Sequence, residues 1–222
     1  MEITWFGHAC FRIKGKDAVL VTDPCSADMG YPMKNVSARI VTLSHAHDGH
    51  GHPEVVGNGP RVLKGPGEYE IGDVFIIGVN TFHDSSHGAE RGKNTIYLIE
   101  MDDIRILHLG DLGHALSPSQ VEELGKVDVV MVPVGGVSTI GAKTAREIVL
   151  LLGAKIVIPM HFQTKASSWL EPVNLFLKEM GLGNLAPQTK LVVTRSNIPS
   201  EMQVLLLEHS AQAGEATPTT TA

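Results

Sequence analysis

Four histidines occupy the nine positions of the stretch SHAHDGHGH, residues 44–52. His45 and His47 are separated by one residue, and alternate residues in a loop can direct two imidazoles to one metal ion. His50 follows at a spacing that a metal site can also use. The stretch therefore predicts a metal site, and the number of ions that it serves depends on the rest of the chain.

Ligand-type residues also follow apolar segments elsewhere. His45 follows IVTLS, His83 follows IIGVNTF, Asp111 follows RILHLG and His161 follows IVIPM. In layered α/β proteins, functional side chains gather where loops leave one end of the strands. We therefore expect these four residues to converge on one pocket. Imidazole and carboxylate ligands without cysteine favour zinc, iron or manganese over a thiolate structural site.

The other histidines are weaker candidates. His108 lies inside an apolar segment, where a buried histidine with a hydrogen-bond partner is expected. His8, in FGHACF, could pack near the site or support a turn, and His52 could replace another ligand but is interpreted as a loop residue. His87 and His114 each lie a few residues beyond a predicted ligand, so each could face a substrate pocket.

Many short strands are needed to position these residues. Segments rich in Val and Ile alternate with Gly and Pro, and several are continuous apolar runs typical of strands covered on both faces. Helices are predicted from Ser117, which forms a capping box with Gln120, and over residues 142–152 and 172–180. The pattern predicts an α/β layered protein, with residues 65–72 interpreted as turns. Strands are expected at residues 2–6, 10–13, 18–23, 39–44, 73–82, 94–101, 104–110, 128–134, 155–160, 190–194 and 202–208.

Length and composition are those of an ordinary globular protein of 222 residues. We expect a single domain over residues 1–209 and a disordered polar tail over 210–222. The net charge of −6 argues against nucleic acid as a partner, because phosphate binding relies on Lys and Arg. Cys10 and Cys25 are expected to be reduced thiols. No signal peptide or membrane span is recognised, so we expect a cytoplasmic protein with no membrane partner; homo-oligomer formation is left open.

The sequence resembles the metallo-β-lactamase-fold hydrolases, in particular their lactonase-like branch. The resemblance is carried by ITWFGHACFRI, VTDP, SHAHDGH, GVNTFHD, LHLGDLGH and IPMHF, in this order and over nearly the whole chain short of the tail. It implies a four-layer αββα sandwich with the site at one edge of the two sheets. It also implies a ligand set in which one ion takes His45, His47 and His83, a second takes His50 and His161, and Asp111 reaches both.

One position departs from the family's motif, which has an aspartate immediately before the third histidine. Gly49 stands there, and Asp48 lies one position early. The second site therefore lacks one carboxylate. The second ion could bind with a solvent ligand instead, a rearranged loop could recruit Asp48 or His52, or the enzyme could work with one ion. On this reading, Gly49→Asp is expected to strengthen the second site.

The resemblance implies a hydrolase with one or two zinc ions, with manganese or iron as alternatives. A metal-bound water has its pKa lowered toward ~7, and the resulting hydroxide would attack an ester, lactone or phosphodiester bond of a small-molecule substrate. Asp111 is the catalytic candidate, because it would hold the ions together and orient that hydroxide. Arg91 and Lys93 lie in a polar segment that could meet an anionic substrate. Two alternatives remain, an iron-dependent oxidoreductase on the same fold and a metal-binding protein without catalysis.

Overall fold

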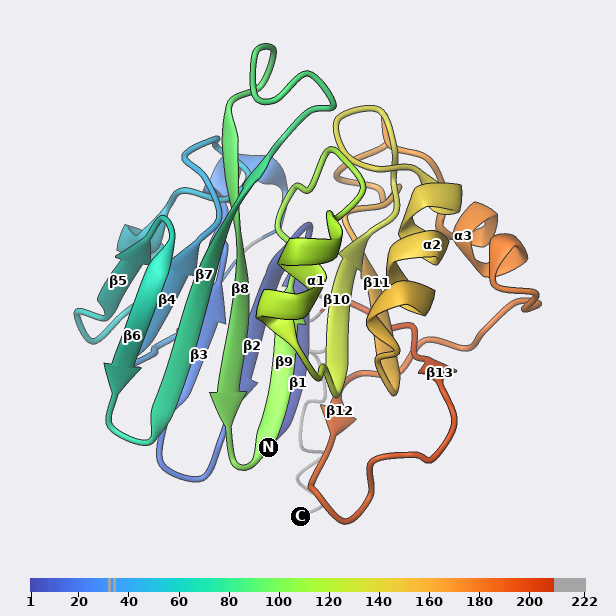
Figure 1. Cartoon of the computed structure of the whole chain (residues 1–222). Coiled ribbons are helices and arrows are strands. Elements are labelled where there is room, and N and C mark those ends of the chain that lie inside the picture. The colour runs from blue at the N-terminus through green and yellow to red at the C-terminus, as the bar shows by residue number, and fades with distance from the viewer. Residues whose placement is uncertain (32, 34, 210–222) are drawn as a thin grey trace, which may run out of the picture.

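Two mixed β-sheets packed face to face form the centre of the computed structural model, which describes residues 1–31, 33 and 35–209 (Figure 1). The first sheet has the strand order β12-β1-β2-β3-β4-β5. Its strands are β1 (Glu2–Gly7), β2 (Cys10–Lys14), β3 (Val19–Thr22), β4 (Ile40–Leu43), β5 (Arg61–Lys64) and β12 (Leu191–Val192).

The second sheet has the order β13-β11-β10-β9-β8-β7-β6. Its strands are β6 (Gly67–Ile71), β7 (Val74–Phe82), β8 (Lys93–Met101), β9 (Ile104–His108), β10 (Val129–Pro133), β11 (Ile156–Met160) and β13 (Gln203–Val204). One continuous apolar core joins the two sheets, with Ile3 and Ile13 from the first and Ile76 and Ile99 from the second all fully buried. Burial of each such side chain contributes about 1.5–3 kcal/mol.

The strand directions bring the ends of several strands to one edge. In the first sheet β1, β3 and β4 run the same way, because β2 is antiparallel to both β1 and β3 and β3 is parallel to β4. In the second sheet β7, β9, β10 and β11 run the same way for the corresponding reason. The loops that follow β4, β7, β9 and β11 carry the predicted ligands. This topology accounts for their convergence.

Helices cover the outer face of the second sheet (Figure 1). They are α1 (Pro118–Leu124), α2 (Ala142–Leu152) and α3 (Val173–Glu179). The capping box of Ser117 and Gln120 is present at α1, and α2 buries the apolar face expected of it. On the other face of the first sheet, Val36, Ala38 and Val56 from the connecting segments pack in a smaller apolar cluster with Val21 and Val41, and the 3-10 turns η1 (Ala27–Met29) and η2 (Pro53–Val55) lie in the loops after β3 and β4. The α/β sandwich is confirmed, with a thin outer layer on that side.

The sequence reading was wrong at the sheet edges. Residues 65–72, interpreted as turns, contain β6, which pairs antiparallel with β7, and β5 was not predicted. Glu68 and Glu70 point to solvent from β6, so the segment has no apolar run. Two other edge strands were overpredicted, since β12 and β13 are far shorter than the strands expected at 190–194 and 202–208. An edge strand pairs on one side only, so its sequence carries a weaker signal.

Other expectations meet the structure as follows. Cys10 and Cys25 are both buried and free of a disulfide. Among the residues described, no helix has the length and apolar character needed to cross a bilayer. The predicted tail, residues 210–222, lies outside the described residues.

Candidate metal centre

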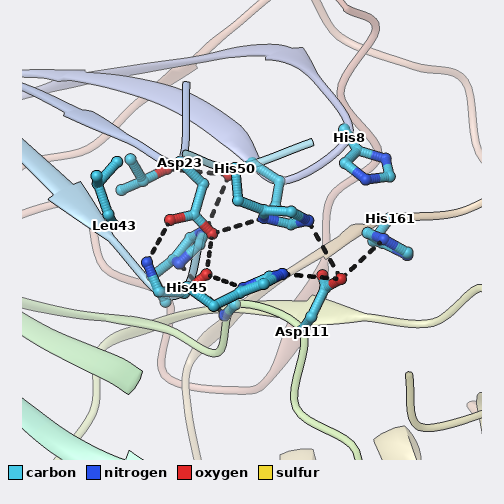
Figure 2. A network of polar contacts seen from close by, with 12 residues as sticks. His8, Asp23, Leu43, His45, His50, Asp111 and His161 are labelled. Carbon is cyan, nitrogen blue, oxygen red and sulfur yellow. Dashed lines mark hydrogen bonds and ion pairs between the residues drawn. The ribbon is translucent and has the colours of Figure 1, made fainter. Parts of the chain in front are cut away.

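The six predicted ligands come together at the edge where the strand ends meet. Four imidazole nitrogens surround one carboxylate oxygen, Oδ2 of Asp111 (Figure 2). The Nε2 atoms of His50, His83 and His161 lie 3.1, 3.2 and 3.3 Å from that oxygen, and Nε2 of His45 lies 3.8 Å away. Asp111 is 3% exposed, so this convergence is buried.

Two clusters of ligand atoms flank Asp111. The open cluster consists of His45, His47 and His83, of which His47 is exposed. The buried cluster consists of His8, His50 and His161, all of them buried. Within each cluster, one ligand atom per residue lies within 4.8 Å of the others. The open cluster corresponds to the first predicted ligand set, whereas the buried cluster contains a histidine that the sequence reading did not assign to a metal.

Several donor atoms in this region are buried and have no hydrogen-bond partner in the described structure. They are Nδ1 of His8, His83 and His161, Nε2 of His45 and His50, and Oδ1 of Asp111. Each unsatisfied buried polar group costs about 1–3 kcal/mol. A divalent cation beside Asp111 would satisfy those of these atoms that face it, namely Nε2 of His45 and His50 and Oδ1 of Asp111. The donor set, imidazole with one carboxylate, therefore fits zinc or another transition metal.

Charges inside the site are strongly coupled. Burial alone would raise the pKa of the Asp111 carboxyl, but the neighbouring His161 and His50 hold it well below its usual value. Burial alone would lower the pKa of His50, but Asp111 and Asp23 on either side raise it to about 10. Both carboxylates thus favour the charged form of His50.

Asp23 and Ser44 orient two of the histidines. Asp23 Oδ2 accepts a hydrogen bond from His50 Nδ1 at 2.9 Å, and Asp23 Oδ1 accepts one from the Ser44 backbone N–H at 2.7 Å. The Ser44 hydroxyl donates its only proton to Asp23, so it accepts from His45 Nδ1 at 2.9 Å. Both imidazoles therefore present Nε2 toward Asp111, the arrangement by which outer partners fix metal ligands.

Sequence reasoning missed these two orienting residues. Asp23 was noted only as part of VTDP, and Ser44 only as the residue before His45. Each stands directly after a strand, β3 or β4, at the edge that holds the ligands. Position after a strand was therefore the signal that could have found them.

A cleft of about 230 Å³ opens beside the two clusters. Besides the ligands, its walls include Met29, Arg91, Ser138 and Trp169. The Trp169 side chain is half exposed, and the Ser138 hydroxyl is buried without a hydrogen-bond partner in the described residues. The cleft thus offers a cation, a hydroxyl and an aromatic surface next to the metal ligands.

Asp84 builds the loop that brings Arg91 to this cleft. Its carboxylate accepts four backbone hydrogen bonds, from the N–H groups of Ser86, Gly88, Glu90 and Arg91, at 2.7–3.1 Å. Desolvation opposes ionisation of Asp84, but these donors prevail and lower its pKa to about 2. The loop is therefore folded around an ionised carboxylate.

Two histidines considered for the pocket are placed elsewhere. Nε2 of His114 accepts from the Phe82 backbone N–H at 3.1 Å, and its Nδ1 donates to the Ala115 carbonyl at 2.7 Å. His87 packs edge-on against the Phe82 ring and is exposed. Neither lines the cleft, so both support the loops around it.

The remaining side chains with open roles do not reach the ligand clusters. The Asp48 side chain is 92% exposed. His52 Nδ1 lies 2.6 Å from Glu54, so the expected loop role of His52 fits the structure. His108 is fully buried, and its Nε2 donates to the Ala9 carbonyl at 2.8 Å, as expected for a core histidine.

Comparison with known proteins identifies the family. The profile of the β-lactamase superfamily domain matches residues 2–161. The chain belongs to the metallo-β-lactamase superfamily. A UPF0173 protein of Pyrococcus abyssi is 31% identical, over 74% of this chain and 84% of its own length. A UPF0173 metal-dependent hydrolase of Pyrococcus horikoshii is 29% identical, with 74% and 85% covered.

Solved structures of the superfamily agree with the fold. A candidate zinc-dependent hydrolase from Thermotoga maritima is 42% identical, with a TM-score of 0.79 over 93% of this chain and 97% of its own. The diiron β-hydroxylase CmlA from Streptomyces venezuelae shares the fold at 15% identity, with a TM-score of 0.55 over 87% of this chain and 54% of its own. At that level of identity the likeness concerns the fold alone.

Proposed function

We propose that this metal-dependent hydrolase cleaves an ester, lactone or phosphodiester bond of a small substrate and uses two divalent ions, with zinc as the physiological metal. The observation that carries the proposal is the buried Asp111 carboxylate, which is within 3.8 Å of imidazole nitrogens from both clusters. A carboxylate in that place can bridge two ions. Ions bound there would supply Lewis acidity and an acidified water molecule.

Different residues of the chain would bind the ions, contact the nucleophilic water and orient the ligands. The open cluster, His45, His47 and His83, would hold one ion, and His50 and His161 would hold the other, with Asp111 reaching both. Asp111 also remains ionised, so it can accept a hydrogen bond from a nucleophilic water. Orientation by Asp23 fixes the ligands before substrate arrives, which keeps the cost of reorganisation low.

The cleft indicates the kind of substrate. Arg91 supplies a cation beside the ligands. Arg prefers planar carboxylate or phosphate groups, which it can bind through two hydrogen bonds. Trp169 and Met29 add apolar surface. We infer a small substrate that carries an anionic or strongly polar group next to the bond that is cleaved.

The test is a hydrolysis panel of esters, lactones and phosphodiesters with protein stripped of metal and then loaded with zinc, manganese or iron. We expect turnover only after loading, with about two equivalents bound, and no turnover by Asp111→Asn under the same loading. If fully loaded protein cleaves nothing in the panel, the bond class is wrong. Iron in both sites of protein purified without added metal, with colour in the visible range, would instead favour the oxidoreductase alternative.

A further inference from the structure

His8 lies in the turn between β1 and β2, inside the metal centre. Its ring centroid is 4.0 Å from that of His161 and 4.9 Å from that of His50 (Figure 2). The residue is 4% exposed, and its Nδ1 has no hydrogen-bond partner in the described structure. A buried imidazole without a hydrogen-bond partner, beside two other imidazoles, fits the role of a metal ligand.

The backbone holds His8 and His161 together. The His8 carbonyl accepts hydrogen bonds from the His161 backbone N–H at 3.1 Å and from the Trp5 indole N–H at 3.0 Å. Both histidines have left-handed φ values, +52° for His8 and +50° for His161. Such values are uncommon for residues other than glycine, and they cluster at functional sites. Two such residues bonded to each other indicate a geometry that is fixed before any ligand binds.

The ring of His8 fills the space beside Gly49. A Cβ atom built on Gly49 would lie 2.7 Å from His8 Nε2 and 2.8 Å from its Cδ2. That separation is shorter than any real contact of a Cβ, and the packed ring cannot simply swing aside. The position from which the family's aspartate would extend therefore faces an imidazole. Asp48 points to solvent and His52 is bound to Glu54, so neither replaces that aspartate.

We propose that His8 is the third imidazole ligand of the second ion, in the coordination position that Gly49 leaves without a side chain. The second site then consists of His8, His50, His161 and Asp111, all supplied by the folded chain. The inference rests on the proposed metal centre and is independent of which bond the enzyme cleaves. It also predicts metal preference, because three neutral imidazoles and one carboxylate favour zinc or cobalt over manganese or magnesium.

Metal binding by variants tests the assignment. Metal-free protein is titrated with Co²⁺ while its visible absorption is followed, and bound zinc is then counted by mass spectrometry after dialysis against a chelator. His8→Gly removes the ring and suits the left-handed backbone, and we expect it to weaken the second ion at least ~10-fold, since partners outside the ligand shell already give about 10–100-fold. Affinity for the first ion should not change.

Substitutions at positions 8 and 49, made singly and together, give a more specific test of the second ion's affinity. Gly49→Asp alone should weaken the second ion, because the new Cβ meets the His8 ring. The double variant His8→Gly with Gly49→Asp should recover much of the lost affinity, because the aspartate then has room to enter. His52→Ala is the matched control, a histidine removed from the same region without effect on either ion.

Three results would overturn the assignment. They are an unchanged second-ion affinity in His8→Gly, a second ion that binds more tightly in Gly49→Asp alone, and a wild-type chain that binds one ion only. Failure of the proposed reaction would look different, namely two ions bound and no hydrolysis. If His8→Gly does not fold, as judged by thermal unfolding of the metal-free protein, His8→Asn serves instead because asparagine tolerates the same φ.

Discussion

The open and buried clusters use the same side-chain chemistry in different surroundings. His47, in the open cluster, is exposed, whereas His8, His50 and His161 are 4%, 1% and 1% exposed, although all four residues line the cleft. Nδ1 of His8 and of His161 is buried without a hydrogen-bond partner in the described structure, which is unfavourable, and an ion bound in the buried cluster would offset part of this cost. On the proposed assignment, the exposed His47 would leave the first ion more open to solvent than the second. The comparison teaches that similar ligands can differ in solvent exposure within one site.

Loss of the Asp111 carboxylate, which lies between the two clusters, should have the largest effect on metal binding and on turnover. Asp111→Asn keeps the shape of the side chain but removes the charge that faces four imidazoles. We expect both ions to bind more weakly and kcat to fall more than ~100-fold, since even partners outside the ligand shell cost about 10–100-fold. Metal content and kcat measured together test this. Loss of one ion alone would mean that Asp111 belongs to a single cluster.

Substitution of the orienting residues Asp23 and Ser44 should affect the two ions differently. Asp23→Asn replaces the acceptor of the His50 Nδ1 proton and should weaken the second ion about 10–100-fold. Ser44→Ala removes the acceptor beside His45 and should act mainly on the first ion, by ~10-fold at most. Stepwise Co²⁺ titration resolves the two affinities. Equal effects of both variants on both ions would contradict the division into clusters.

Arg91 should affect substrate and neither ion. We expect Arg91→Ala to raise KM for an anionic substrate by about 10-fold, the lower end of what a hydrogen bond to a charged group contributes. Metal content and the thermal midpoint should stay at wild-type values. Arg91→Lys keeps the charge and should recover part of the affinity. A matched neutral substrate provides the control, because its KM should hardly change.

Low pH should destabilise the loop that is folded around Asp84, and this is the smallest effect that we expect. Its pKa of about 2 in the folded chain lies below the ordinary value of about 3.9. The carboxylate therefore stabilises the loop fully above pH ~4, and this contribution is lost as the pH falls through about 2. Amide-exchange protection of Arg91 in the metal-free protein should decrease over that window. In Asp84→Asn the protection should already be low and independent of pH.

The sequence was most informative where an apolar strand runs directly into a polar residue. That pattern identified His83, Asp111 and His161, because the side chains at the ends of aligned strands must meet. The same pattern applies to His8, which follows β1 at the same edge. The sequence led us to expect only that His8 packs near the site or supports a turn, because the ligand set implied by the family resemblance does not include this residue.

The sequence could not show which side chains occupy the space next to a given position. Gly49 reads as a missing ligand, and a repair by the nearby Asp48 or His52 seems natural when only neighbours in sequence are considered. The contact between residue 49 and His8 depends on how two loops from different strands pack. On the proposed role of His8, that contact makes Gly49→Asp weaken the second site, whereas the sequence alone predicts that it strengthens the site. Edge strand β6 was missed for a related reason. Its sequence is polar, and the strand is defined by its pairing with β7, which its own residues do not reveal.

The chain positions of the two clusters set the order in which they can be completed on the ribosome. All residues of the open cluster lie between His45 and His83, in the first half of the chain. The buried cluster needs His8, from the first turn, and His161, which follows β11. On the proposed assignment, an ion bound there would join the N-terminal hairpin to a strand made much later, so its binding would have to wait until most of the protein has been synthesised.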